Sequence, residues 1–195
     1  MILDGKPLAE HEKPTALHIK PTALDLRSND FALFNLPFCF AQDRAAIDAR
    51  WKELQREAHP DKFSAQGTAA QRIAMQWSVR INEAYQRLKD PLQRAAYLCE
   101  LHQSPVNAEN NTAMPAAFLM QQIELHEALE EAATEEDLDK LSLQINEIEH
   151  KQLSEIEHLL DAQQNYPQAA EAVRALMFTA RFRRGVQARY EALGQ

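Results

Sequence analysis

The sequence predicts an all-α protein built from two helical units. Only 4 of its 195 residues are glycine, and 45% are hydrophobic against 26% charged, a balance that is ordinary for a soluble globular protein. Apolar residues recur three and four positions apart along most of the chain, which is the spacing of one helix face. The length allows one large domain or two small ones.

Charge separates the two units. Residues 1–27 have a net charge of zero, residues 28–103 of +1 and residues 104–195 of −9. The change supports a two-part architecture, and the acidic second part argues against nucleic-acid binding there, because phosphates would be repelled. No apolar run approaches the roughly 20 residues that cross a bilayer. The acidic N-terminal residues and the missing hydrophobic region predict neither a transit peptide nor a signal peptide.

Residues 1–27 are predicted to be a flexible N-terminal extension. They contain a short repeat, in which the Lys-Pro-Thr-Ala-Leu of residues 13–17 recurs at residues 20–24. Both prolines disfavour a continuous helix. The alternative is a docking peptide for a partner.

Residues 28–103 are expected to form the first folded unit, from four helical patterns. A short apolar helix begins at Phe31 and is stopped by Pro37. A helix over about 43–58 follows, with Asp43 as its N-cap. After a short polar loop come two further helices, about Thr68–Leu88 and, started by the pair Asp90-Pro91, a helix that reaches about His102.

The two longer helices of this unit each carry one apolar stripe, and two antiparallel helices joined by a short loop make a helical hairpin. Trp51 and Trp77 lie on the facing stripes and are expected in the core between them. The stripes consist of Ile47, Trp51, Leu54 and Ala58 on one helix, and of Ile73, Trp77, Ile81, Ala84, Tyr85 and Leu88 on the other.

Residues 104–112 are polar and form the best linker candidate, and residues 113–195 are expected to form a three-helix bundle. Thr134 is a natural cap, with Asp137 three positions on in the manner of a capping box. Amphipathic helices with short connections indicate an antiparallel bundle. The expected helices are Pro115–Ala133, Glu135–Gln164 and Pro167–Leu193.

The tripeptide His59-Pro60-Asp61 separates the two helices of the hairpin. Pro60 fixes its own backbone angle and disfavours helical geometry in the residue before it, so the helix must end here. Asp61 can accept hydrogen bonds, and His59 is held at the tip. We expect a rigid, exposed polar point, flanked by basic residues: Arg44, Lys52, Arg56 and Lys62. The alternative is a turn that ends the helix and has no further function.

Catalysis by this chain is not expected. His59 and Asp61 could act as a base and its orienting group, but no recognisable Ser or Cys nucleophile and no Gly-rich phosphate loop accompany them. Cys39 and Cys99 form no CxxC pair and no Cys/His cluster, so the sequence predicts no metal site and no cofactor. Two isolated cysteines suit a reducing cytosol, and a cytoplasmic location is expected.

The first helix of the bundle carries apolar residues on two opposite sides. At about 100° per residue, Phe118, Leu125, Leu129 and Ala132 share one side, and Leu119, Met120 and Ile123 share the other. The first stripe can pack into the bundle. The second, edged by Glu124, Glu127, Glu130 and Glu131, has the character of a partner site. The alternative is that the bundle buries both stripes.

The N-terminal unit resembles a J-domain, the module with which DnaJ-type co-chaperones stimulate their heat-shock ATPase partners. The likeness covers about residues 30–97 and rests on four segments: Phe31 to Pro37, Leu54 to Phe63 around the tripeptide, Ile81 to Tyr85, and Leu88 to Tyr97. Many J-domains have a tyrosine before the tripeptide, where this chain has Ala58. The change removes a packing group but leaves the recognition residues.

The second half narrows the resemblance to the HscB family of iron–sulfur co-chaperones. Residues 94–98, 118–125 and 173–178 carry it, and it covers essentially all of residues 30–195. It implies a J-domain that stimulates an HscA-type ATPase and a bundle that presents an IscU-type scaffold protein, with no nucleic acid and no membrane involved. It also implies a scaffold contact at Leu119, Met120, Ile123, Glu124, Glu127 and Phe178. Two rivals remain: a J-protein serving a general DnaK-type chaperone with another client, and a purely structural helical adaptor.

Overall fold

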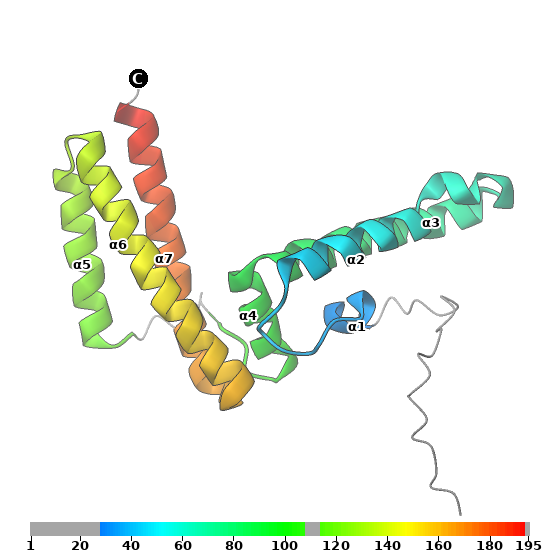
Figure 1. The fold of residues 1–195 in the computed structure, drawn as a ribbon, viewed down its shortest axis with the longest axis horizontal. Coiled ribbons are helices and arrows are strands. Elements are labelled where there is room, and N and C mark those ends of the chain that lie inside the picture. The colour runs from blue at the N-terminus through cyan, green and yellow to red at the C-terminus, as the bar shows by residue number, and fades with distance from the viewer. Residues whose placement is uncertain (1–27, 108–113, 194–195) are drawn as a thin grey trace, which may run out of the picture.

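The described part of the protein, in a computed structural model, comprises residues 28–107 and 114–193, and it is helical without strands. The expected all-α fold class is confirmed. Figure 1 shows two arms that meet at an angle: a long helical hairpin, and a bundle that carries the C-terminus at its far end. The extension predicted for residues 1–27 lies outside the described residues.

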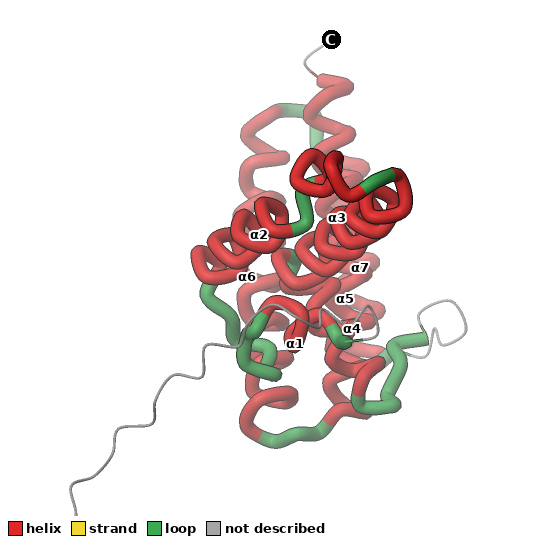
Figure 2. Tube along the Cα trace, turned by 90° about the vertical axis from the view of Figure 1, so that its right-hand side faces the viewer, coloured by secondary structure: helices red, strands yellow, loops and turns green. Residues whose placement is uncertain are grey.

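The first arm contains four α-helices and one 3₁₀ helix. The hairpin helices α2 and α3 lie side by side and antiparallel, α1 packs across them, and α4 sits at the corner where the arms meet (Figures 1 and 2). Their bounds are α1 Asp30–Phe34, α2 Arg44–Glu57, the 3₁₀ helix η1 Pro60–Gln66, α3 Thr68–Lys89 and α4 Pro91–Leu101.

The second arm is an antiparallel bundle in which α6 runs against α7 over most of its length. The helix α5 covers only the upper part of that pair, and it runs in the same direction as α7 (Figure 1). The bounds are α5 Ala116–Glu131, α6 Glu135–Glu157, the π-helical turn η2 His158–Ala162 and α7 Tyr166–Leu193.

Side chains cap three of these helices as the sequence predicts. The carboxylate of Asp43 accepts the N–H of Ala45, and that of Asp90 accepts the N–H of Leu92. Thr134 and Asp137 form the expected capping box, in which each side chain accepts the backbone N–H of the other residue. Caps satisfy backbone donors that a helix cannot pair internally, and so they fix where a helix begins.

Three local expectations differ from the structure. The first helix ends at Asn35, which adopts a left-handed conformation with φ 51°, two residues before Pro37. The loop after the tripeptide is a 3₁₀ helix that ends at Gly67, whose φ of 91° favours glycine. The helix expected to reach Gln164 changes to a π-helical turn at His158.

The larger hydrophobic core joins the two arms. It is built from buried residues of the hairpin and α4, such as Leu54, Leu88 and Leu98, together with Ile156 and Val173 from the base of the bundle. A second, smaller core fills the upper bundle between the three helices, with members that include Leu125, Leu138, Ile145, Phe182 and Val186. Because a single close-packed core spans the corner, the two arms are held at a fixed angle and are not joined only by a flexible linker.

Polar contacts reinforce the corner. The Asp161 carboxylate, in η2, accepts the backbone N–H groups of Phe40 and Ala41 at 2.7 and 2.8 Å. The Arg94 Nε donates to the Phe40 carbonyl at 2.9 Å. The rings of His102 and Tyr166 stack with centroids 3.7 Å apart.

The described part of the expected linker also belongs to this corner. Val106 is buried, and its carbonyl oxygen accepts a hydrogen bond from Arg174 Nη1 at 2.8 Å. Residues 108–112 of that linker lie outside the described residues. The division of the chain at this segment therefore stays a prediction, although its first residues are packed against α7.

The hairpin core departs from the predicted stripes at two places. Ile73 is 55% exposed. It lies in the first part of α3, beyond the end of α2, where η1 packs against α3 and buries Ala74 instead. Ser78 Oγ, which donates to the carbonyl of Ala58, is level with the end of α2. Trp51 and Trp77 are half-buried and pack against the edge of the core. The Trp51 ring stacks on Tyr85, and its Nε1 donates to Asn82 Oδ1 at 3.0 Å.

Candidate functional site

The His59-Pro60-Asp61 tripeptide lies at the outer end of the hairpin and faces solvent. Ala58 ends α2, His59 is extended, and Pro60 opens the 3₁₀ helix η1. The backbone N–H of Asp61 donates to His59 Nδ1 at 3.3 Å, and the Asp61 carboxylate lies 3.6 Å from the same nitrogen. The side chains of His59 and Asp61 are 57% and 89% exposed, so a partner can reach both.

Three of the four predicted basic residues lie near the tripeptide. Lys52 and Arg56 are exposed and one turn apart on α2, and Lys62 is exposed on η1. The Arg56 Nε donates to the Lys52 carbonyl at 3.4 Å, and its guanidinium has no other hydrogen bond or ion pair among the described residues. The arrangement suits long-range attraction of an acidic surface.

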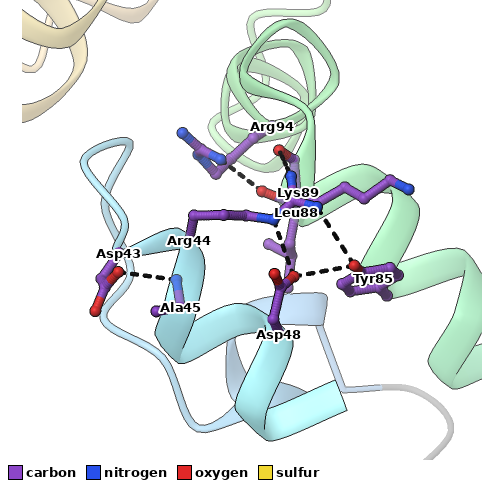
Figure 3. A network of polar contacts seen from close by, with 8 residues as sticks. All are labelled: Asp43, Arg44, Ala45, Asp48, Tyr85, Leu88, Lys89 and Arg94. Atoms are coloured by element: carbon purple, nitrogen blue, oxygen red, sulfur yellow. Dashed lines mark hydrogen bonds and ion pairs between the residues drawn. The ribbon is translucent and has the colours of Figure 1, made fainter. Parts of the chain in front are cut away.

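Arg44 lies elsewhere, at the first position of α2, roughly 20 Å along the helix from the tripeptide at 1.5 Å per residue. Figure 3 shows it reaching across to α3. Its Nε pairs with Asp48 at 2.9 Å, and its Nη1 donates to the Lys89 carbonyl at 3.1 Å. Its assignment to the ATPase contact stays a prediction, and its contacts give it a role in joining α2 to α3.

The same contacts set the electrostatics of this end of the hairpin. Partial desolvation opposes ionisation of Asp48, but hydrogen bonds from Tyr85 and Arg44 hold the pKa of this carboxyl below its ordinary value. The carboxylate in turn raises the pKa of Arg44. This end therefore carries paired charges, whereas the tripeptide end carries exposed cations.

The predicted scaffold face on α5 is exposed. Leu119, Met120 and Ile123 are 46%, 63% and 56% exposed, which is unusual for three large apolar residues on one helix face. The opposite stripe packs inward, with Leu125 and Ala132 buried. The alternative in which the bundle buries both stripes is therefore wrong.

The other predicted scaffold residues lie on α5 and α7, and their assignment to the scaffold contact stays a prediction. Glu124 and Glu127 are exposed beside the apolar stripe. Phe178 is half-buried on α7, and its ring meets that of Phe118 edge-on with centroids 5.9 Å apart. Phe178 thus joins α7 to the inward stripe of α5, to which Phe118 belongs.

Sequence reasoning missed the residues that hold the corner, above all Asp161, Arg94 and Arg174. Their partners are backbone groups up to 121 positions away, so no local pattern identifies them. It also missed Gln122, which is 9% exposed in α5 with no partner for its side-chain nitrogen among the described residues. An amide on the predicted inner side of an amphipathic helix was the one available signal.

Burial raises the pKa of both cysteine thiols and so lowers their reactivity. Both cysteines are free thiols, and burial raises the pKa of Cys99 to about 11. Burial also raises the pKa of Cys39, with the nearby Asp161 carboxylate adding to the effect. Among the described residues, no three His, Cys, Asp or Glu side chains are grouped as metal ligands. The helices described also include none long and apolar enough to span a membrane.

Comparison with known proteins yields one family. Residues 114–187 match the family model for the HSCB C-terminal oligomerisation domain. The chain is 47% identical to the co-chaperone protein HscB homologues of Burkholderia multivorans and Burkholderia vietnamiensis, in each case over 171 residues that cover 86% of this chain and 97% of the relative.

Solved structures agree with the sequence relatives. The chaperone HscB from Vibrio cholerae superposes with a TM-score of 0.74 at 32% identity, over 85% of this chain and 99% of that one. The human co-chaperone protein HscB shares the fold, with a TM-score of 0.81 at 24% identity, over 86% of this chain and 85% of the human one. The exposed tripeptide on a helical hairpin, the acidic bundle and these similarities agree, and the chain belongs to the HscB co-chaperone family.

Proposed function

We propose that this protein stimulates the ATPase of an HscA-type heat-shock chaperone and delivers an IscU-type scaffold protein to it during iron–sulfur cluster assembly and transfer. The observation that carries the proposal is the placement of two exposed surfaces on separate arms of one body. The tripeptide His59-Pro60-Asp61 ends the first arm, and the apolar stripe of Leu119, Met120 and Ile123 lies on the second.

The ATPase contact comprises the tripeptide and the basic residues around it, Lys52, Arg56 and Lys62, with Arg44 as a more distant member. Their positive charges steer association with an acidic surface, and so the contact weakens as salt concentration rises. The tripeptide supplies a stiff polar point, since Pro60 limits the backbone and Asp61 is tied to His59.

The scaffold contact comprises Leu119, Met120, Ile123, Glu124, Glu127 and Phe178. An exposed apolar stripe bordered by charge gives affinity by burial and orientation by its rim. Because one core spans both arms, scaffold bound to the bundle is held at a high effective concentration near the chaperone. The protein itself catalyses no reaction in this scheme and works in the cytoplasm, where its two free cysteines stay reduced.

The test measures ATP turnover by a purified HscA-type chaperone with the scaffold, in the presence of the wild-type protein or the His59→Gln variant. Stimulation is expected to vanish in the variant while scaffold binding, followed by calorimetry, is retained. His150→Gln is the matched control, because His150 is also an exposed histidine, on α6. Undiminished stimulation by His59→Gln contradicts the proposal, and stimulation of a DnaK-type but not an HscA-type chaperone supports the rival J-protein function.

A further inference from the structure

We infer that the scaffold-binding face continues along α7 beyond Phe178, where Arg181 and Arg184 form a basic edge that recognises carboxylates on the scaffold and sets its orientation. This inference rests on the proposed function and adds two residues and a charge preference to it.

The first argument is the state of the arginines on α7. Three of them are committed to other parts of the protein: Arg174 to the carbonyl of Val106, Arg183 to Asn146 and Glu149 on α6, and Arg189 to the carbonyl of Ala132. Arg181 and Arg184 are exposed, and neither makes a hydrogen bond or ion pair with any described residue. Their positive charges are available to a partner.

The second argument is their position on the helix. Four residues of α7 face α5: Phe178 meets Phe118, Phe182 meets His126, Gly185 lies beside Leu129, and Arg189 reaches Ala132. Arg183 and Tyr190 instead face α6. At 100° per residue, Arg181 lies next to the α5-facing row, on the side turned away from α6. Arg184 lies one turn later and about 60° farther round from that row, toward the outer side of α7.

The same reasoning places the apolar stripe of α5. Phe118, His126 and Leu129 face α7. Leu119 and Ile123 lie next to that row on the exposed side, again turned away from α6. Because α5 and α7 run in the same direction, these residues and Arg181 open onto one common face of the bundle.

Across this face the side chains change from acidic to apolar to basic. Glu124 and Glu127 lie on its α5 edge, the apolar stripe and Phe178 in its middle, and Arg181 and Arg184 on its α7 edge. Residues 104–195 have a net charge of −9, so two arginines without a partner among the described residues stand out from this acidic part of the chain. A partner with an apolar centre, carboxylates on one side and cations on the other binds in one orientation only.

The experiment measures scaffold binding by the full-length protein at low and high salt. The Arg181→Glu/Arg184→Glu double variant is expected to bind about tenfold more weakly at low salt, mostly through slower association, with the difference shrinking at high salt. Arg181→Lys/Arg184→Lys should retain most of the affinity.

The matched control is Lys140→Glu/Lys151→Glu, which makes the same change in net charge on exposed positions of α6. It should change the affinity for the scaffold by less than about twofold, because exposed charges away from a contact contribute little. Equal weakening by both double variants, or none by the arginine variant, overturns the inference. If the wild-type protein does not bind the scaffold, or if the Leu119/Met120/Ile123→Ala variant binds it unchanged, the proposed function itself fails.

Discussion

The carboxylate of Asp161 accepts a hydrogen bond from the backbone N–H of Phe40 at 2.7 Å, across 121 positions of the sequence. Its other oxygen accepts the N–H of Ala41 at 2.8 Å. One side chain at the base of the bundle thereby satisfies two backbone donors in the segment between α1 and α2. Because charge-assisted hydrogen bonds are stronger than neutral ones, this contact fixes the first arm against the bundle.

Replacing Asp161 with Ala should lower the free energy of unfolding by about 2–3 kcal/mol, since two backbone N–H groups lose their acceptor. Urea denaturation followed by circular dichroism measures the change. Glu155→Ala, an exposed carboxylate on α6, serves as the control and should cost less than about 0.5 kcal/mol. Equal stabilities of the two variants would show that Asp161 does not hold the corner.

Asp30 is a second structural carboxylate, fully buried between Arg80 and Arg87 at 2.6 and 3.1 Å. Asp30→Asn leaves two cations without their counter-charge. The free energy of unfolding should fall by about 2–4 kcal/mol. This is slightly less than for breaking a fully buried ion pair, because both arginines are partly exposed. Thermal unfolding measures this loss of stability. The control is Asp43→Asn, because asparagine is also a good helix cap. Comparable melting temperatures for the two variants would contradict a structural role for Asp30.

The Leu119→Ala/Met120→Ala/Ile123→Ala variant separates binding from folding. All three side chains are exposed, so scaffold binding should fall by at least about a hundredfold while stability changes by less than about 1 kcal/mol. The control is Leu125→Ala on the buried side of α5, which should cost about 2–5 kcal/mol of stability. A triple variant that unfolds as readily as Leu125→Ala would mean that the stripe belongs to the core.

The stability of the protein should decline in alkaline solution through Cys99. Its pKa is raised from 9.0 to about 11 by burial, so the unfolded thiol ionises first. The stabilising contribution is complete below pH 9 and is lost as the pH rises toward 11, at up to about 1 kcal/mol per pH unit. Urea denaturation at pH 8 and pH 10 should show a larger decline for wild type than for Cys99→Ala.

A thiol reagent offers an independent check on the same burial. At pH 8 Cys39, which is half-buried, should react with a disulfide reagent in the folded protein, whereas Cys99 should react only at the rate of unfolding. Mass spectrometry of the labelled peptides distinguishes the two. Rapid labelling of Cys99 in native protein would show that α4 opens locally without global unfolding.

The sequence by itself determined the features that depend on neighbouring residues. The helices follow from three- and four-residue apolar spacing, and their starts from caps such as Asp43, Asp90 and Thr134. The break at Pro60 and the two-sided pattern of α5 are equally local. Their physical causes lie within one or two helical turns, and so they are visible in the order of residues alone.

The tertiary structure decided what depends on residues far apart in the chain. Ile73 belongs to a helical stripe, yet it is exposed, because beyond the end of α2 the segment η1 packs on α3 and covers Ala74 instead. Arg44 is one of several basic residues on α2, yet its guanidinium is engaged with α3. The angle between the arms depends on Asp161 and on a core shared across more than a hundred positions, and contacts of that kind leave no periodic trace in a single sequence.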